Sequence, residues 1–358
     1  MFYRPTWVEI NLEALAHNYH FVKNQVASKQ VVPVIKADAY GHGAVKVMNR
    51  LIQEGVKLVA VSLLEEAIEL RRENQTIDIL IMGPVLKDQF DLCHEHHFQL
   101  TVYNHDIAQA ILSYPQSLMC HLKIDTGMHR YGISDVNFMC EWMIKLKSTK
   151  HNLKGIYTHL ATANEQDNLF FSQIESMKAL LEQLPYLPEM IHVSNSSASL
   201  RYEKYLTWTT HVRLGISLYG LSLDKDQKGL HPVMSLKSKV IDLKTLNLGD
   251  PLGYGASYHA KEQHEKIAIL PIGYADGWIR KNKTGFVEIK GKLFPMVGII
   301  CMDACFVKVD DSIKLNDEVT LFGGKITTDE VASRLNTISY EIVCQISKRV
   351  PRIYIKEE

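Results

Sequence analysis

The amino-acid sequence predicts an α/β protein: an N-terminal (β/α)8 barrel of the TIM type followed by a mainly β C-terminal domain. Two observations support this fold class. Eight short apolar runs alternate with amphipathic segments, which is the arrangement of eight strand–helix units in about 220 residues. After about Leu223, strand-like segments follow one another with only turn residues between them. A chain of 358 residues is long enough for two hydrophobic cores.

The eight apolar runs have the length of strands and are apolar nearly throughout, which is typical of a parallel sheet buried on both faces. An open doubly wound sheet is the alternative. It needs a glycine-rich fingerprint after the first strand, and the sequence there is KADAYGHG rather than GxGxxG. Pro33 counts slightly against a central strand, although proline is tolerated near a strand's start. The predicted strands are residues 31–35, 58–62, 77–82, 99–102, 119–124, 153–158, 190–193 and 211–214.

The segments between these runs are expected to be helices. Asn11 is a good N-cap for the first helix, and residues 45–52 have apolar side chains at helical spacing after a start near Ala44. Residues 62–65 read SLLE, which predicts a capping box at the start of the next helix. The barrel is predicted to span residues 9–223.

Residues 224–358, together with the N-terminal segment 1–8, are predicted to form the β domain. A Lys-Gly-Lys sequence at residues 290–292 is typical of a hairpin turn, and residues 328–335 form the clearest helical pattern in this part of the chain. The strand-like segments are residues 267–272, 286–289, 293–297, 304–309 and 318–322.

Composition restricts the classes of function. The chain has 40 basic and 40 acidic residues, so its charge does not favour nucleic acid or an anionic membrane surface. The N-terminus has no signal-peptide pattern, and no apolar run approaches the roughly 20 residues needed to span a bilayer. We therefore expect a cytoplasmic protein without a membrane partner. The six cysteines lack metal-type spacing, and no metal site is expected.

Active sites of such barrels lie at the carboxyl ends of the strands, and polar residues are concentrated there in this sequence. Lys36 is the most informative of them, because it follows a fully apolar run and should lie in the barrel mouth. Partial burial favours the neutral form of a lysine, which is a Schiff-base nucleophile. The strand-end residues are Lys36, Lys123, His159, Asn195, Ser196, Arg213 and Gly215.

The segments after the last two strands, residues 194–199 and 213–217, are rich in small residues and resemble the usual phosphate site of such barrels. Small side chains let backbone N–H groups approach an anion, and Ser196 adds a hydroxyl. A Schiff-base lysine on the first strand with a phosphate cradle on the last two implies pyridoxal phosphate. Schiff-base aldolases that act on phosphorylated substrates use similar parts and remain an alternative.

Ten motifs in order resemble those of bacterial alanine racemases, which are fold-type III enzymes that use pyridoxal phosphate. This resemblance covers nearly the whole chain. It implies a barrel, a β domain and a homodimer. The motifs are TWVEINLEALAHN, VIKADAYGHGA, LKIDTGMHRYG, THLATA, HVSNSSA, VRLGISLYG, GYGASY, PIGYADG, CMDA and RVPRIY.

The resemblance, taken position by position, implies roles in both domains. Lys36 forms the Schiff base, Arg213 faces the pyridine nitrogen, and His159, also a cofactor contact, stands between Arg213 and a second base, Tyr254. Lys123 matches a lysine that is carbamylated in several family members. The residues implied around the phosphate are Tyr40, Ser196, Gly215, Ile216 and Tyr340. The residues implied at the substrate are Arg130, the backbone of Met302, Tyr254 and Tyr274, with Tyr274 and Tyr340 narrowing the entrance.

Racemisation removes the Cα proton from one face and returns a proton to the other, so two bases on opposite faces are the direct solution. The resemblance assigns Lys36 to the D-substrate and Tyr254 to the L-substrate. A free tyrosine has a pKa of about 10, so a tyrosine base needs positive charge nearby. An arginine at the pyridine nitrogen keeps its proton, which weakens the electron sink and disfavours transamination.

Tyr254 lies in the β domain, outside the barrel that contains Lys36. The family supplies this tyrosine from the partner subunit, so we expect a head-to-tail homodimer with two shared active sites. The implied activity is the interconversion of L-alanine and D-alanine, with supply of D-alanine for peptidoglycan as the commoner role in the family.

Two departures from the family pattern concern the substrate entrance. Asn164 replaces the usual aspartate, and Ile299 stands where an arginine is frequent, which together look like a removed ion pair. Serine or broader-specificity racemases share the scaffold and are the alternative reading. An amino-acid decarboxylase is disfavoured by Arg213, and a non-catalytic cofactor carrier of the single-barrel kind is disfavoured by the domain that contains Tyr254.

Overall fold

The structure, a computed structural model, describes residues 3–355 apart from residues 27, 166, 223 and 225–226. The chain forms two compact units: Ala16–Leu230, which we call the barrel unit, and Met1–Leu15 with His231–Glu358, which we call the β unit. The predicted division after residue 223 lies near the end of the barrel unit. The N-terminal share of the β unit is longer than the predicted 1–8, because β1 (Thr6–Asn11) pairs with strands of that unit along its length.

The barrel unit contains an eight-stranded parallel sheet in the order β2-β9-β8-β7-β6-β5-β4-β3. Its two ends meet at a parallel bridge between Val34 and Ala60, and the Ile35 N–H donates to the Ala60 carbonyl at 2.8 Å. The predicted barrel is therefore confirmed. The strands are β2 (Gln30–Pro33), β3 (Leu58–Val61), β4 (Asp78–Ile81), β5 (Gln99–Val102), β6 (Met119–Lys123), β7 (Asn152–Tyr157), β8 (Met190–His192) and β9 (His211–Leu214).

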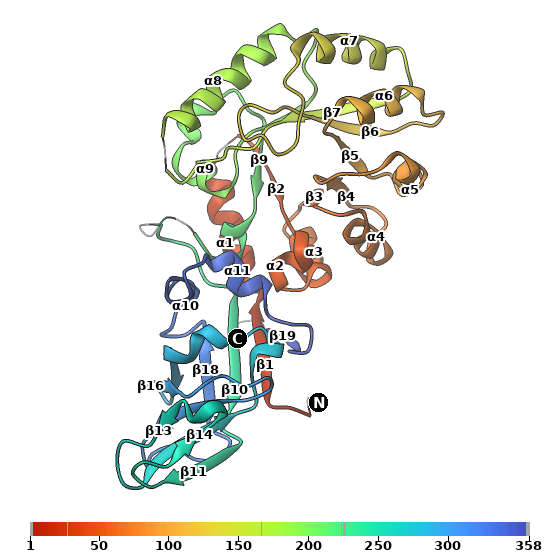
Figure 1. Cartoon of the computed structure of the whole chain (residues 1–358). Helices are drawn as coiled ribbons and strands as arrows, with labels where there is room; N and C mark the ends of the chain where they lie inside the picture. Colours follow the sequence, from red (N-terminus) through yellow and green to blue (C-terminus); the bar gives the residue numbers. More distant parts are fainter. Residues whose placement is uncertain (1–2, 27, 166, 223, 225–226, 356–358) are drawn as a thin grey trace. The chain divides into compact units, whose positions relative to one another are not determined.

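The helices α3 to α8 lie outside the ring of strands (Figure 1). Their amphipathic pattern explains this: in α3, for example, Val47, Met48 and Leu51 are buried and the opposite face is polar. No helix in the described part of the chain has the length and apolarity to cross a bilayer. The helices are α1 (Leu12–Gln25), α3 (Ala44–Gln53), α4 (Leu64–Glu73), α5 (Phe90–Glu95), α6 (His105–Ser113), α7 (Val136–Lys147), α8 (Asn168–Gln183) and α9 (Ser196–Arg201), with the 3-10 turns η1 (Lys87–Gln89), η2 (Glu203–Tyr205) and η3 (Ile216–Tyr219).

Between β2 and α3 the chain makes a left-handed helical turn, α2 (Lys36–Gly41), which the sequence did not predict. Residues 37–40 all have φ between 52° and 54°. This conformation costs roughly 1–2 kcal/mol for each residue that has a Cβ atom, so four in succession need stabilising contacts from outside the turn. The turn places Lys36 at its start and the buried Tyr40 near its end.

The start of α4 differs from the prediction by one residue. The sequence predicted Ser62 and Glu65 as the capping pair, but the helix begins at Leu64 and its N-cap is Leu63. The carboxylate of Glu66 accepts hydrogen bonds from the N–H groups of Ser62 at 2.8 Å and Leu63 at 3.0 Å. Because Glu65 and Glu66 are adjacent, the sequence alone did not determine which glutamate caps the helix. The position at which β3 ends determines it.

The β unit is built on a nine-stranded sheet in the order β11-β14-β17-β16-β15-β18-β10-β1-β19. The predicted hairpin at residues 290–292 joins β15 to β16, with positive φ at Lys290 and Gly291 as its tight turn requires. The predicted helix 328–335 is α10; the six-residue α11 was not predicted, because its N-cap, Ile338, gives no capping signal.

The bounds of the remaining elements complete the β unit. Its strands are β10 (Met234–Lys239), β11 (Asp242–Leu246), β12 (Pro251–Leu252), β13 (Tyr258–His259), β14 (Glu265–Leu270), β15 (Phe286–Ile289), β16 (Lys292–Val297), β17 (Cys305–Val309), β18 (Glu318–Phe322) and β19 (Arg352–Ile355). Its helices and 3-10 turns are η4 (Tyr254–Ala256), η5 (Tyr274–Asp276), η6 (Arg280–Thr284), α10 (Thr328–Leu335) and α11 (Ser339–Cys344).

Candidate active site

The carboxyl ends of the barrel strands bring together charged side chains from distant parts of the sequence. Lys36 follows β2, Lys123 ends β6, His159 follows β7, and Arg213 lies in β9. The positive charges of Arg213, Lys123, Arg130 and Lys36 all act on His159, so these side chains lie near it. The barrel mouth is therefore strongly cationic and suits an anionic ligand.

A small cradle of hydrogen-bond donors lies beside this cationic cluster. The N–H groups of Gly215 and Ser217 donate to Ser196 Oγ at 2.9 and 3.4 Å. A Cβ atom on Gly215 would lie 3.0 Å from the Tyr40 hydroxyl and 3.6 Å from Ser196 Oγ, so only glycine leaves this space open. Ile216, the next residue, is buried at the start of η3. Hydroxyl and backbone N–H donors around a side-chain-free position fit the phosphate group of pyridoxal phosphate.

Asn195, one of the strand-end residues singled out from the sequence, has a different place. Its side-chain oxygen accepts a hydrogen bond from the Ala198 N–H at 3.1 Å and caps α9. Its amide nitrogen donates to the Leu160 carbonyl at 3.5 Å. Both ends of the side chain therefore serve the local fold.

Arg213 is buried, and barrel carbonyls hold its guanidinium in one orientation. Its Nη1 donates to the His192 carbonyl at 2.5 Å, and its Nη2 donates to the carbonyls of Thr158 at 2.8 Å and Val193 at 3.2 Å. The Arg213 Nε–H makes no hydrogen bond to any residue that the structure describes, so it remains available to a ligand. Burial lowers the pKa of this guanidinium to about 10, which still leaves it protonated near neutral pH.

A chain of hydrogen bonds leads from Arg213 through the barrel core. Arg213 Nη1 lies 3.1 Å from His192 Nδ1, His192 Nε2 lies 3.0 Å from His121 Nδ1, and His121 Nε2 lies 2.7 Å from Gln99 Oε1. A guanidinium can only donate, so both imidazoles accept at Nδ1 and donate at Nε2. Gly155 makes room for this chain, because a Cβ there would lie 2.4 Å from His121 Nδ1.

Both imidazoles of this chain must be neutral for the hydrogen bonds to run in one direction. Burial is the main cause that lowers the pKa of His121 to about 3 and the pKa of His192 well below its usual range. The two rings are fully buried. This series of hydrogen bonds therefore transmits no charge, and it fixes the orientation of Arg213 through the contact at Nη1.

Lys123 and His159 flank Arg213 at the barrel mouth. Burial, helped by repulsion from Arg213 and Arg130, lowers the pKa of Lys123 to about 7. Burial and the Arg213 charge lower the pKa of His159 well below its usual range, so this imidazole is neutral. Arg213 Nη2 lies 3.4 Å from His159 Nδ1, which leaves the proton on Nε2.

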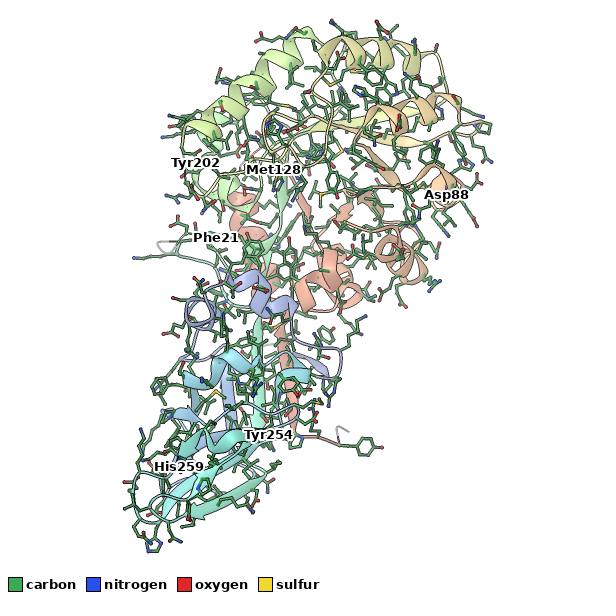
Figure 2. The ribbon with its side chains drawn as sticks, in the orientation of Figure 1. Phe21, Asp88, Met128, Tyr202, Tyr254 and His259 are labelled. Atoms are coloured by element: carbon green, nitrogen blue, oxygen red, sulfur yellow. The ribbon has the colours of Figure 1, made fainter. Side chains whose placement is uncertain are left out.

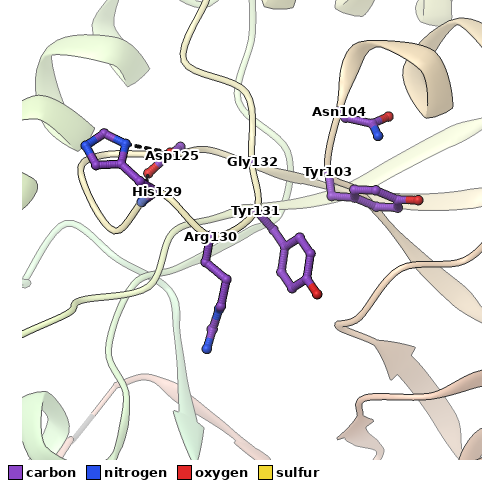
Figure 3. Close-up of a pocket in the computed structure, with 7 residues that line it drawn as sticks. All are labelled: Tyr103, Asn104, Asp125, His129, Arg130, Tyr131 and Gly132. Atoms are coloured by element: carbon purple, nitrogen blue, oxygen red, sulfur yellow. Dashed lines mark hydrogen bonds and ion pairs between the residues drawn. The ribbon is translucent and has the colours of Figure 1, made fainter.

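Arg130 lies in the loop after β6, where seven residues line a pocket of about 430 Å³ (Figure 3). The Arg130 side chain is exposed and extends away from the His129–Asp125 ion pair, whose Nδ1–Oδ2 distance is 3.2 Å. Its guanidinium carbon lies 6.0 Å from the Tyr131 ring centroid. The lining residues are Tyr103, Asn104, Asp125, His129, Arg130, Tyr131 and Gly132.

Four of the predicted site residues lie in the β unit rather than in the barrel unit. Tyr254 (Figure 2) is 67 % exposed on that unit, between Gly253 and Gly255, which both have positive φ. Tyr274 and Met302 are also exposed large side chains. The fourth residue is Tyr340, which is half-buried in α11, and burial raises its pKa to about 12.

The loops that carry Tyr274 and Met302 are joined to each other within the β unit. The Tyr274 N–H donates to the Cys301 carbonyl at 3.0 Å, and the Ala275 N–H donates to the Met302 carbonyl at 3.1 Å. Gly273 allows this approach, because a Cβ there would lie 2.3 Å from the Cys301 carbonyl oxygen. Two backbone hydrogen bonds therefore hold these loops together.

A buried carboxylate anchors the first of these loops. Asp276 is fully buried and receives two hydrogen bonds from the Arg4 guanidinium, both at 2.8 Å, and one from the Gly273 N–H at 3.0 Å. Arg349 lies between Asp276, at 3.7 Å from its Oδ1, and Asp303, at 2.6 Å. These contacts join Arg4, near the N-terminus, and Arg349, in the RVPRIY motif, to the loops that contain Tyr274 and Met302.

Comparison with known proteins identifies the family. The family model "Alanine racemase, N-terminal domain" matches residues 10–223, and the model "Alanine racemase, C-terminal domain" matches residues 233–354. The chain belongs to the alanine racemase family. The resemblance inferred from the ten motifs is therefore confirmed.

Individual alanine racemases are similar to this chain over its full length. The alanine racemase of Anoxybacillus flavithermus is 38 % identical over 100 % of this chain and 96 % of its own length. Alanine racemase 1 of Bacillus subtilis is 37 % identical over 99 % of this chain and 94 % of its own. Among solved structures, the Bacillus anthracis enzyme with bound L-Ala-P has a TM-score of 0.92 at 34 % identity, covering 99 % of this chain and 96 % of that one.

Several residues that hold the side chains of the candidate site in place were not predicted from the sequence. His121, His192 and Gln99 lie inside apolar strands, where a polar residue at an inward position was the available signal. Asp276 in YADG and Glu66 after β3 gave no signal of their own. Their partners are remote in sequence or are backbone N–H groups, and only the folded chain brings them together.

Proposed function

We propose that this protein interconverts L-alanine and D-alanine with pyridoxal phosphate as its cofactor. The observation that supports this most strongly is the combination of Lys36, the Ser196–Gly215 cradle and Arg213 in one barrel mouth, in a chain related over its full length to alanine racemases. Solved relatives were obtained with bound L-Ala-P and in complex with cycloserine, which is consistent with an alanine-sized pocket.

Lys36 would hold the cofactor covalently, and the Arg213 Nε–H would donate to its pyridine nitrogen. When bound, pyridoxal phosphate supplies an electron sink that makes the Cα proton of an attached amino acid acidic. The donors of the cradle would hold the phosphate with Tyr340. Residues in this proposed set are Tyr40, Ser196, Gly215, Ile216 and Tyr340, with His159 beside the ring.

Two groups of the chain would move the proton. The Lys36 amine takes the Cα proton of D-alanine on one face, and the Tyr254 hydroxyl oxygen takes that of L-alanine on the other. The opposite group then gives its own proton to the other face of Cα, so one turnover ends with the base protonated and the donor deprotonated, which is the state that the reverse reaction needs. The cations Arg130 and Arg213 favour a negative charge on a phenol oxygen that enters the mouth.

The substrate carboxylate would be held by Arg130 and by the Met302 backbone, with Tyr274 and Tyr340 narrowing the entrance. A carboxylate binds a guanidinium with two parallel hydrogen bonds, which orients Cα between the two bases. We propose that Tyr254, Tyr274 and Met302 act in the site of the partner subunit of a homodimer, which accounts for their exposure on one chain.

Lys123 is proposed to be carbamylated. Its depressed pKa makes the neutral amine available at neutral pH, and this is the form that adds carbon dioxide. The product is an anion beside Arg213 and Arg130, so the reaction replaces a repulsive charge by an attractive one. Carbon-13 NMR after incubation with labelled bicarbonate should show one carbamate signal that Lys123→Met removes.

We infer a cytoplasmic enzyme that supplies D-alanine for peptidoglycan, with serine as a minor substrate. Neither the chain's neutral balance of charge nor its motifs favour a nucleic-acid partner.

One assay tests the proposed function. The cofactor-loaded protein is incubated with L-alanine in D2O, and D-alanine, deuterium at Cα and carbon dioxide are measured together, with L-serine in parallel. We expect D-alanine that carries deuterium and no carbon dioxide. Release of carbon dioxide, or exchange at Cα without D-alanine, would reject racemisation. Faster turnover of serine than of alanine would reject alanine as the preferred substrate.

A further inference from the structure

The left-handed turn that begins with Lys36 is held from outside by Glu66. Glu66 Oε1 accepts a hydrogen bond from the Ala37 N–H at 2.6 Å. Its other oxygen, Oε2, accepts from the N–H groups of Ser62 and Leu63 at the start of α4. One carboxylate therefore joins the residue next to Lys36 to the carboxyl end of β3.

A second carboxylate fixes the far end of the same turn. Asp38 Oδ1 accepts a hydrogen bond from the Ala44 N–H at 2.7 Å, and the Asp38 carbonyl accepts from the Gly43 N–H at 2.9 Å. These contacts cap α3 and close the turn on itself. Glu66 links Ala37 to a neighbouring strand–helix unit through its side chain, whereas the Asp38 contacts stay within the same segment of the chain.

We propose that Glu66 is a positioning residue for Lys36, holding the strained turn so that the lysine amine points at the reacting carbon. This inference rests on the proposed function. Residues 37–40 stay in a conformation that L-amino acids disfavour only while outside contacts over-determine it. Release of the Ala37 N–H lets the turn relax, and the relaxation reaches Lys36 first because Lys36 is the adjacent residue.

The geometry explains why a glutamate stands at this position. Three N–H groups point at two oxygen atoms, so the site needs an acceptor at both ends of the side chain. Glutamine offers one acceptor and would direct its NH2 group at an N–H donor. Aspartate has two acceptors, but its chain is shorter by about 1.5 Å, so it cannot cap α4 and also reach Ala37.

Three variants separate positioning from helix capping. Glu66→Asp keeps a carboxylate that can cap α4 and loses the bond to Ala37. Glu66→Ala loses both. Glu65→Ala is the matched control, because Glu65 is exposed in the same first turn and makes no hydrogen bond or ion pair among the described residues. Thermal unfolding of each cofactor-loaded variant shows whether α4 and the barrel remain folded.

Two readouts report on the turn without measuring turnover. Hydrogen–deuterium exchange by mass spectrometry follows the peptide that contains residues 36–41. Borohydride trapping measures how fast Lys36 becomes labelled when pyridoxal phosphate is added to cofactor-free protein. We expect faster exchange in that peptide and slower labelling for Glu66→Asp and Glu66→Ala, with Glu65→Ala equal to wild type.

Isotope effects then test the effect on the lysine step. The two enantiomers of alanine have equal free energy, so kcat/KM must fall by the same factor in both directions, and we expect about tenfold for Glu66→Asp. The primary deuterium isotope effect should rise for D-alanine labelled at Cα and fall for L-alanine, because the Lys36 step becomes limiting. A structural defect alone would leave the balance between the two isotope effects unchanged.

The outcomes decide between the alternatives. Wild-type exchange, labelling and isotope effects in Glu66→Asp would overturn the proposal, and so would a loss of stability in Glu66→Asp with unchanged isotope effects. If Glu66→Ala does not fold, Glu66→Asp decides alone. If wild type does not racemise alanine, the proposed function fails, while exchange and labelling still report whether Glu66 holds Lys36.

Discussion

At the scale of single residues, the orientation of Arg213 is set by backbone carbonyls and by side chains of the barrel core. Its guanidinium donates to backbone carbonyls, and its Nη1 also begins the hydrogen-bonded series His192, His121 and Gln99. Because each donor in that chain has one acceptor, loss of the last acceptor leaves a buried N–H without a partner. The stability of the barrel core should therefore be sensitive to Gln99.

We expect Gln99→Leu to lower the free energy of unfolding by about 1–3 kcal/mol, the cost of an unsatisfied buried polar group. Urea unfolding measures it. Gln109→Leu is the control, because Gln109 is exposed on α6 and its substitution should leave the midpoint unchanged. If Gln99→Leu and wild type are equally stable, the hydrogen bonds that join Arg213, His192, His121 and Gln99 contribute nothing to the stability of the fold.

Lys123 gives a prediction about pH. Its pKa in the folded protein is about 7, against 10.5 for the free side chain, mainly because of burial. The folded state therefore disfavours the charged lysine, and the unfolded state binds the extra proton between pH 7 and about 10. The resulting destabilisation is complete below pH 7 and is relieved as the pH rises through this window.

Lys123→Met should remove that dependence. In buffer free of carbon dioxide, the variant is expected to gain stability over wild type at pH 6 and to gain much less at pH 9. Urea unfolding at the two pH values measures the difference. A gain that is the same at both values would contradict the depressed pKa of Lys123.

At the scale of elements, the loop that contains Tyr274 is anchored by the buried Asp276, which is paired with the partly exposed Arg4. Asp276 is inaccessible to solvent, and Arg4 supplies two of its hydrogen bonds from a residue distant in sequence. A buried carboxylate that loses its partner is destabilising, because the remaining charge is left in a poor environment. The fixed position of the η5 turn should therefore need Arg4.

Arg4→Ala is expected to destabilise the protein by about 3 kcal/mol and to raise KM for alanine more than it lowers kcat. Thermal or urea unfolding and steady-state kinetics measure the two effects. Lys178→Ala is the control, because it breaks only the exposed 2.9 Å pair with Glu175, which is worth about 0–1 kcal/mol. An Arg4 variant that matches this control would show that Arg349 alone is sufficient for Asp276.

At the scale of the whole molecule, the two proposed bases lie in different compact units. Lys36 belongs to the barrel unit and Tyr254 to the β unit. If each site takes Lys36 from one subunit and Tyr254 from the other, a hybrid of two inactive chains has one complete site. This arrangement can be tested without knowing the geometry of the dimer.

Lys36→Ala and Tyr254→Phe homodimers should both be nearly inactive, and a reassorted mixture should recover up to about a quarter of the wild-type activity per chain. Half of the dimers are then hybrids, and half of their sites are intact. Activity is measured before and after mild dissociation and reassembly. If the reassorted mixture is as inactive as the two parent homodimers, both bases of a site belong to the same chain.

The extent of the sequence prediction differs from element to element. The eight barrel strands were found within two residues at either end, because each is a short apolar run bounded by polar segments. The left-handed turn at residues 37–40 was not found, because its Ala-Asp-Ala-Tyr sequence has no intrinsic preference for positive φ. The capping carboxylate of α4 was predicted one residue early, because the local sequence pattern does not distinguish the adjacent residues Glu65 and Glu66.

The sequence by itself determined the fold class and the chemical groups of the site: apolar runs of strand length, a lysine at the end of the first, and small residues after the last two. These properties are local, so spacing and residue type reveal them. Only the tertiary structure decided which contacts hold these groups. Glu66 accepts a hydrogen bond from Ala37, Gln99 and two histidines continue the hydrogen bonds of Arg213, and Arg4 donates to Asp276. Those contacts join residues distant in sequence or use backbone N–H groups, and their strength comes from burial, which exists only once the chain has folded.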